Sequence, residues 1–145
     1  MRDYLCVLVT ALALGSPLAC ADGAADGATA LLERGIAAYL KADATAALRE
    51  WVKGGAMEAN TQALSQANVL RQIEDFYGKP QGYDLVHESI LSSRARTLYF
   101  TINYETGLSF GRLTVYRKDD GTWVTTSFLF HTEAAQIFPA SLLGD

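Results

Sequence analysis

The chain has 145 residues, of which 50% are hydrophobic and 19% charged, and its formal net charge is −4 at pH 7. This length predicts one domain, and the apolar content excludes a largely disordered chain. A net negative charge without a cluster of Lys and Arg disfavours nucleic-acid binding, because such a surface repels phosphate.

The first 21 residues have the pattern of a signal peptide. Positive charge at Arg2 precedes an apolar run over residues 5–14, which Gly, Ser and Pro at 15–17 then end. The run is too short to span a membrane as a helix. This pattern predicts an exported protein, either periplasmic or secreted.

Small residues define the expected cleavage site. Ala19 and Ala21 stand where signal peptidase requires small side chains, so we expect cleavage before Asp22. Residues 22–27 are small and polar, as in a flexible linker. The remaining residues, 28–145, then form a single domain.

The two cysteines, Cys6 and Cys20, both precede this cleavage site. The mature chain therefore offers no thiol for a disulfide, a thiolate metal site or a nucleophile. An alternative is a lipoprotein in which Cys20 becomes the acylated N-terminus. Leu18 and Ala19 fit a lipobox, whereas Pro17 replaces its usual Leu or Val. Only in that alternative is the protein held at a membrane.

Helical periodicity fills the first half of the predicted domain. Apolar residues recur at three- and four-residue spacing in three segments, residues 31–40, 44–53 and 57–77. Asp43 is a good N-cap for the second helix, Asn60 and Thr61 interrupt the start of the third, and Gly78 ends it.

From Tyr83 onward the periodicity changes to the alternation of β-strands. Four strands are expected, over residues 83–91, 95–105, 108–118 and 122–132. Short turns such as Asp119-Asp120-Gly121 join them, so neighbouring strands should be antiparallel. We therefore predict an α+β fold with the N-terminal helices packed on a four-stranded antiparallel meander. The tail, 133–145, is expected to form a short helical turn and a loose or docked end.

Two stretches carry a resemblance to a known family. The helical run from Tyr39 to Trp51 and the hairpin sequence 119–124, followed by Phe-Leu-Phe at 128–130, resemble small exported members of the NTF2-like (cone-shaped α+β) superfamily. The resemblance implies an apolar cleft between helices and concave sheet. Members use it for catalysis, as in ketosteroid isomerase and polyketide cyclases, or for ligand binding, and many pair through the exposed sheet face. A cystatin-like fold is the structural alternative.

The strands supply the candidate residues for a small apolar or carboxylate ligand. These are Tyr99, Phe100, Tyr104, Arg112, Phe128, Phe130 and His131. The phenylalanines also fit simple core packing, and Arg112 fits either the cleft or an outward-facing position. Alternation places His131 on the face of Trp123, and places Tyr99 and Trp123 on a second face that would serve a dimer.

An enzymatic alternative uses His87, Asp84 or Glu88 as a base, with tyrosines as donors. Alternation places Asp84 and Glu88 on one face and His87 on the other, with Tyr83 and Leu85. Two histidines without cysteine disfavour a structural zinc site, and no phosphate-binding loop or hydrolase motif predicts a cofactor.

The leading prediction is a non-catalytic, extracytoplasmic binding or interaction module with an apolar cleft, acting as a homodimer or with a protein partner. The enzymatic alternative would use the same cleft. A lipid-anchored accessory subunit, with Cys20 acylated, is the third interpretation.

Overall fold

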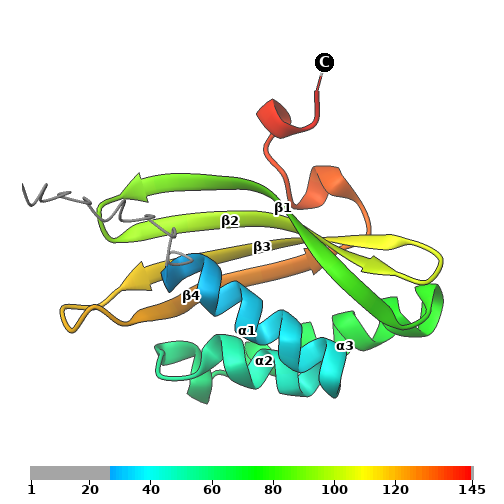
Figure 1. The fold of residues 1–145 in the computed structure, drawn as a ribbon, viewed down its shortest axis with the longest axis horizontal. Helices are drawn as coiled ribbons and strands as arrows, with labels where there is room; N and C mark the ends of the chain where they lie inside the picture. The colour runs from blue at the N-terminus through cyan, green and yellow to red at the C-terminus, as the bar shows by residue number, and fades with distance from the viewer. Residues whose placement is uncertain (1–26, 145) are drawn as a thin grey trace, which may run out of the picture.

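Three helices followed by a four-stranded sheet make up the chain in the computed structural model, which describes residues 27–144 (Figure 1). The helices are α1 (Gly27–Lys41), α2 (Ala44–Val52) and α3 (Thr61–Tyr77), with a 3₁₀ turn, η1 (Ala56–Ala59), before α3. The strands are β1 (Pro80–Ser92), β2 (Ala95–Tyr104), β3 (Leu108–Arg117) and β4 (Trp123–His131). The C-terminal segment contains two 3₁₀ turns, η2 (Ala134–Gln136) and η3 (Ala140–Leu142).

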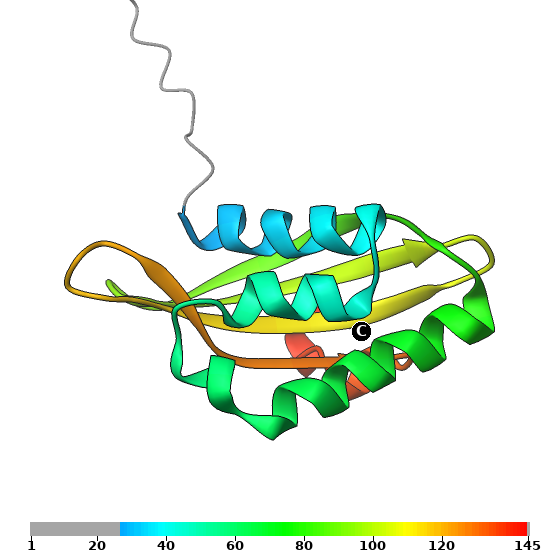
Figure 2. The same cartoon turned by 90° about the horizontal axis from the view of Figure 1, so that it is seen from below.

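The predicted α+β fold is confirmed. The sheet is an antiparallel meander in the order β1-β2-β3-β4, and all three helices lie across one of its faces (Figure 2). The predicted signal peptide, both cysteines and the linker up to residue 26 lie outside the described residues. Gly27, expected to end the linker, is instead the first residue of α1. Within residues 27–144, no helix combines the length and apolar character needed to cross a bilayer.

Asp43 and Gly78 act as the sequence predicts, and Asn60, expected only to interrupt the third helix, is its N-cap. The Asp43 carboxylate accepts a hydrogen bond from the Ala46 backbone N–H at 2.8 Å, and Asn60 caps α3 through the Gln62 N–H at 2.8 Å. Each bond satisfies a backbone donor that has no partner within its helix. Gly78 ends α3 with a positive φ of 87°, a conformation that costs glycine little.

Trp51 fills the space between the helices and the sheet. Its side chain is fully buried and its ring stacks on Phe130 with centroids 5.3 Å apart. Its indole N–H donates to the Leu32 carbonyl of α1 at 3.1 Å. Phe100 of β2, also fully buried, lies beside both rings, with its centroid 6.5 Å from Trp51 and 6.0 Å from Phe130. Trp51 of α2 thus contacts both α1 and the strands β2 and β4.

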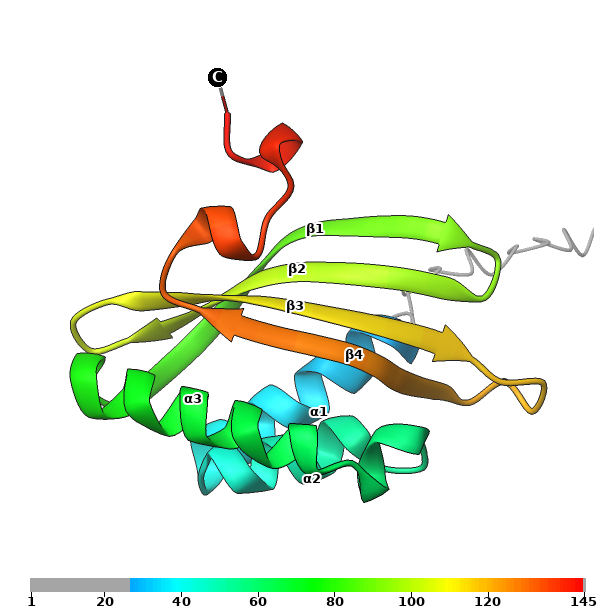
Figure 3. The same ribbon diagram turned by 180° about the vertical axis from the view of Figure 1, so that it is seen from behind.

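The opposite face of the sheet, which we call the outer face, is partly covered by the C-terminal segment (Figure 3). Phe138 is buried there and packs edge-on against Tyr99 of β2 and Phe110 of β3, with centroids 5.8 Å and 5.3 Å apart. Aromatic edge-to-face pairs are favourable beyond the area they bury. The tail is therefore docked, which was one of the two states expected for it.

Candidate functional site

The predicted ligand residues divide between the two faces of the sheet. Phe100, Tyr104, Phe128 and Phe130 point toward the helices and are at most 6% exposed, as members of the hydrophobic core. Phe100 and Phe130 pack against Trp51, Phe128 packs against Phe130, and Tyr104 packs against Tyr39. These side chains therefore form core contacts instead of lining an open cleft. The alternative reading of the phenylalanines as core residues is the one that the packing supports.

Tyr99, Arg112 and His131 lie on the outer face. Tyr99 is opposite Arg112 in the β2–β3 register, and His131 is opposite Phe110 in the β3–β4 register. Arg112 therefore takes the outward-facing of its two expected positions. The seven predicted residues do not converge on one site.

Two β-bulges explain why simple alternation misplaced several residues. In β1 an extra residue at Val86 places His87 opposite Tyr99 on the outer face, and Glu88 opposite Leu98 on the helix side. Asp84 stays on the outer face, opposite Thr101. The prediction that Asp84 and Glu88 share a face is therefore wrong, because a bulge inverts the alternation after it.

The second bulge lies in β4. Thr126 has no partner in the register, which runs from Thr114–Ser127 directly to Val115–Thr125. Trp123 consequently faces the helices, where it packs against the core cluster, and His131 lies on the other face. The expectation that Trp123 and His131 share a face, and that Trp123 belongs to a dimer surface, is corrected.

Of the three candidate bases, Glu88 is separated from the other two by the sheet. Asp84 and His87 are exposed on the outer face, and the Asp84 carboxylate accepts from the Asn103 amide at 2.7 Å. Glu88, on the helix side, forms an ion pair with Arg96 at 2.6 Å. Within residues 27–144, no group of three or more His, Cys, Asp or Glu side chains is placed to hold a metal ion.

Tyr104 belongs to a buried chain of hydroxyls. The Ser109 hydroxyl donates to the Tyr104 oxygen at 3.4 Å, the Tyr104 and Tyr39 oxygens lie 3.4 Å apart, and Tyr39 donates to the Leu70 carbonyl at 3.3 Å. Because the Tyr39 hydroxyl donates its hydrogen bond to the Leu70 carbonyl, the Tyr104 hydroxyl is the donor between the two tyrosines. Burial raises the pKa of both phenols above the ordinary 10.0, and the Tyr104 contact adds to the rise at Tyr39.

Both phenols are expected to remain protonated in the folded protein as the pH rises through 10.0. Their raised pKa means that the stability linked to them is complete below about pH 10 and is lost as the pH rises further. Tyr39→Phe and Tyr104→Phe should each remove one late step from an absorbance titration, and should make the alkaline loss of unfolding free energy less steep. Full ionisation of every tyrosine near pH 10 in the folded state would contradict this.

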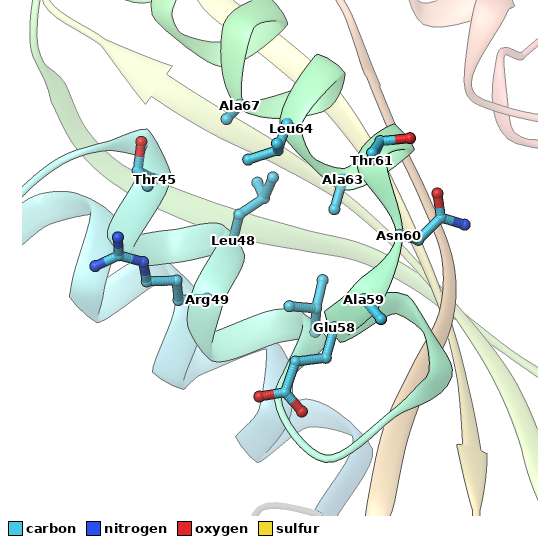
Figure 4. Close-up of a pocket in the computed structure, with 11 residues that line it drawn as sticks. Thr45, Leu48, Arg49, Glu58, Ala59, Asn60, Thr61, Ala63, Leu64 and Ala67 are labelled. Atoms are coloured by element: carbon cyan, nitrogen blue, oxygen red, sulfur yellow. The ribbon is translucent and has the colours of Figure 1, made fainter.

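The helical layer contains an apolar hollow. A space of about 300 Å³ lies between α2, η1 and α3. Its floor consists of the buried residues Leu48, Val52, Ala63 and Ala67, and Leu64, 62% exposed, stands at its side. In Figure 4, Leu48 and Leu64 reach toward each other across it. Small side chains at two successive turns of α3 leave the room for it.

Polar groups surround this apolar floor. Arg49 lines the hollow from α2, and no ion pair of Arg49 is present in the described part of the chain. Thr45, one turn earlier, accepts from the Arg71 guanidinium. Glu58 lies on the η1 side, where one carboxylate oxygen accepts from the Gly54 N–H at 3.1 Å. The α2 side of the hollow therefore carries positive charge next to an apolar surface.

A second, more open hollow of about 500 Å³ lies between the end of α3 and the end of β4. Val69, Ile73 and the exposed Phe76 line it from α3, and His131 lines it from β4. The His131 Nδ1 accepts from the Glu133 backbone N–H at 2.9 Å, which leaves Nε2 as the donor of the neutral ring. Of the predicted ligand residues, His131 lines this hollow.

Sequence reasoning missed the hollow in the helical layer. The spacing of apolar residues over 57–77, which include Ala63 and Ala67, predicts a packed helix face and no space beside it. The available signal was the size of the side chains: an alanine at two successive turns cannot fill the space beside a neighbouring helix, and Arg49 stands directly after the buried Leu48.

The sequence matches no family model, and no curated protein matches it either. Among solved structures, the fold is similar to that of an NTF2-like protein of unknown function from Silicibacter pomeroyi, with a TM-score of 0.49 and 17% sequence identity. The likeness covers 74% of this chain and 93% of the other. A likeness at this level concerns the course of the chain and carries no information about a ligand or an activity.

Proposed function

We propose that the chain is an extracytoplasmic, non-catalytic binding module that takes a small amphipathic carboxylate in the hollow between α2 and α3. The observation that carries the proposal is an apolar floor in a hollow whose lining also includes Arg49 of α2. An aliphatic or aromatic body would cover Leu48 and Val52, and its carboxylate would meet Arg49. Guanidinium–carboxylate contacts combine charge with directed hydrogen bonds, so they orient such a ligand.

Export is the second part of the proposal. The positive start, short apolar run and small residues at Ala19 and Ala21 support it. After cleavage before Asp22, the N-terminus of α1 would follow within a few residues. Acylation at Cys20 would instead tether the same binding domain to a membrane, as in the lipoprotein alternative.

Binding is tested by titrating octanoate into protein recovered from the exported fraction, whose intact mass also reports whether residues 1–21 have been removed. Octanoate should bind saturably, and 1-octanol, which lacks the charge, should bind at least about tenfold more weakly, since a charge-assisted hydrogen bond contributes about 1.5–3 kcal/mol. Arg49→Gln should produce a similar loss for octanoate alone. Ala63→Leu should abolish binding by filling the hollow.

Arg34→Gln is the matched control, because Arg34 is exposed on α1, outside the lining of the hollow. It should leave octanoate binding unchanged. Equal affinity for octanoate and octanol, or an Arg49→Gln variant that binds octanoate as well as the unsubstituted protein, would contradict the proposed site.

A further inference from the structure

Strand β1 is an open edge of the sheet. It pairs with β2 on one side, and among residues 27–144 no strand pairs with its other side (Figure 1). With 13 residues it is the longest of the four described strands, whereas strands average about 5–6 residues. The unpaired N–H and C=O groups of such an edge are a template for another strand.

Apolar side chains are exposed along this edge. Leu85 and Val86 are 40% and 44% exposed, and Ile90 and Leu91 are 69% and 59% exposed. Proteins commonly protect an edge strand with Lys or with an internal Pro. β1 contains no Lys, and its single proline, Pro80, is its first residue. Val86 and Leu91, which have no partner in the β1–β2 register, are two of these four exposed residues.

The other surfaces of the sheet already have cover from this chain. Phe138 packs on the outer face against Tyr99 and Phe110. The opposite edge, β4, lies beside α3, and the Gln66 side-chain oxygen accepts from the Phe130 backbone N–H at 3.2 Å (Figure 3). β1 also contacts α1, where the Tyr83 hydroxyl donates to the Glu33 carboxylate at 3.2 Å, but within residues 27–144 no strand is added to its free edge.

We propose that the partner of this free edge is a second copy of the chain, paired antiparallel along β1 about a two-fold axis between Leu85 and Val86. In this register Asp84 of each copy lies opposite His87 of the other. Both side chains are on the outer face, because Asp84 is opposite Thr101 and His87 is opposite Tyr99 within the chain. A two-fold interface makes every such contact twice.

The charges along β1 disfavour two other registers. Pairing centred on Glu88 would place two Glu88 carboxylates against each other, and like charges directly opposite are unfavourable. Shifting the axis by one residue, to between Val86 and His87, would place Asp84 opposite Ser89 and the apolar Leu85 opposite Glu88. The register centred between Leu85 and Val86 instead brings unlike groups together and places those two apolar side chains at the middle of the interface.

The groups around Asp84 and His87 leave both available for this contact. One Asp84 oxygen, Oδ2, accepts from Asn103, so Oδ1 can accept from the second copy. The His87 ring lies 6.3 Å from the Tyr99 ring, centroid to centroid, and its side chain is exposed. A cross-strand pair of this kind contributes only modestly to the free energy of dimerisation. Apolar contact between the two edges contributes the larger share.

The experiment measures the dimer dissociation constant of the full exported chain by sedimentation equilibrium. Val86→Lys, which adds a charge at the centre of the edge, should weaken dimerisation at least about tenfold. Asp84→His and His87→Asp should each weaken it about three- to tenfold, by placing like groups opposite each other. The double variant Asp84→His with His87→Asp restores the unlike pair, so its dissociation constant should return close to the starting value.

Asp75→Lys is the control, because Asp75 is exposed on α3 and has a carboxylate like that of Asp84. It should leave the dissociation constant unchanged, and urea unfolding of each variant should show that its fold is intact. A chain that stays monomeric up to about 1 mM, the limit of weak association, overturns the proposal. So does a dimer that Val86→Lys leaves unchanged, a double variant without recovery, or a monomer whose β1 edge binds only a foreign extended peptide.

Discussion

Replacing Trp51 with alanine is expected to lower the free energy of unfolding by about 3–5 kcal/mol, as removal of a fully buried Trp or Phe does. The side chain is 0% exposed and contacts three elements, through Phe130 of β4, Phe100 of β2 and the Leu32 carbonyl of α1. Its removal leaves a cavity and a carbonyl without its donor. Because domains of this size are stable by only about 5–15 kcal/mol, urea unfolding should show a large shift in midpoint.

Phe76→Ala provides the matched comparison. Phe76 is 77% exposed at the end of α3, so its truncation should change the unfolding free energy by no more than about 0.5 kcal/mol. Trp51→Phe should fall between the two, since it keeps an aromatic ring in the core but loses the hydrogen bond to Leu32. If Trp51→Ala costs no more than Phe76→Ala, Trp51 does not join the layers as the structure describes.

Much of the fold could be predicted because the signals that define it are local. A capping side chain such as Asp43 lies within three residues of the N–H that it satisfies, and the turn at Asp119-Asp120-Gly121 includes its own positive-φ glycine. The change from a period near four to a period of two is visible at Tyr83. These features fix the element types and their order, and hence the α+β meander.

The faces of the strands were predicted less well, because a bulge leaves no mark in an alternating pattern. One extra residue at Val86 is enough to place His87 and Glu88 on faces opposite to those expected. Thr126 does the same for Trp123. The predicted ligand site required its residues to share one face of the sheet. They lie in the predicted strands but on both faces, so they do not form one site.

The resemblance predicted a cleft between the helices and the sheet. In the structure the Trp51 side chain fills much of that space. Trp51 was recognised as part of an apolar stripe, but its depth was not predictable from spacing. Gly35 was the overlooked signal: a glycine inside a helix costs about 0.5–1 kcal/mol relative to alanine, so its presence indicates that another group approaches closely. That group is the Trp51 ring.

This contact leads to a prediction in which the sign of a substitution reverses. A Cβ atom at Gly35 would overlap the Nε1 edge of the Trp51 ring, which is buried and cannot move aside. Gly35→Ala should therefore destabilise the protein by about 1–3 kcal/mol, the usual cost of overpacking, even though alanine favours a helix. In the Trp51→Ala background the obstacle is gone, and the same substitution should stabilise by about 0.5–1 kcal/mol.

The two measurements complete a double-mutant cycle with a coupling energy of about 1.5–4 kcal/mol, which reaches the upper end for residues in direct contact. Ala37→Gly, at an exposed position in the same helix, controls for helix propensity alone: it should cost about 1 kcal/mol in both backgrounds. Urea unfolding of the variants gives all of these values. If Gly35→Ala destabilises equally with and without Trp51, the glycine is required by something other than the indole, and the close approach of α1 to α2 through Trp51 is not what sets the spacing of the helical layer.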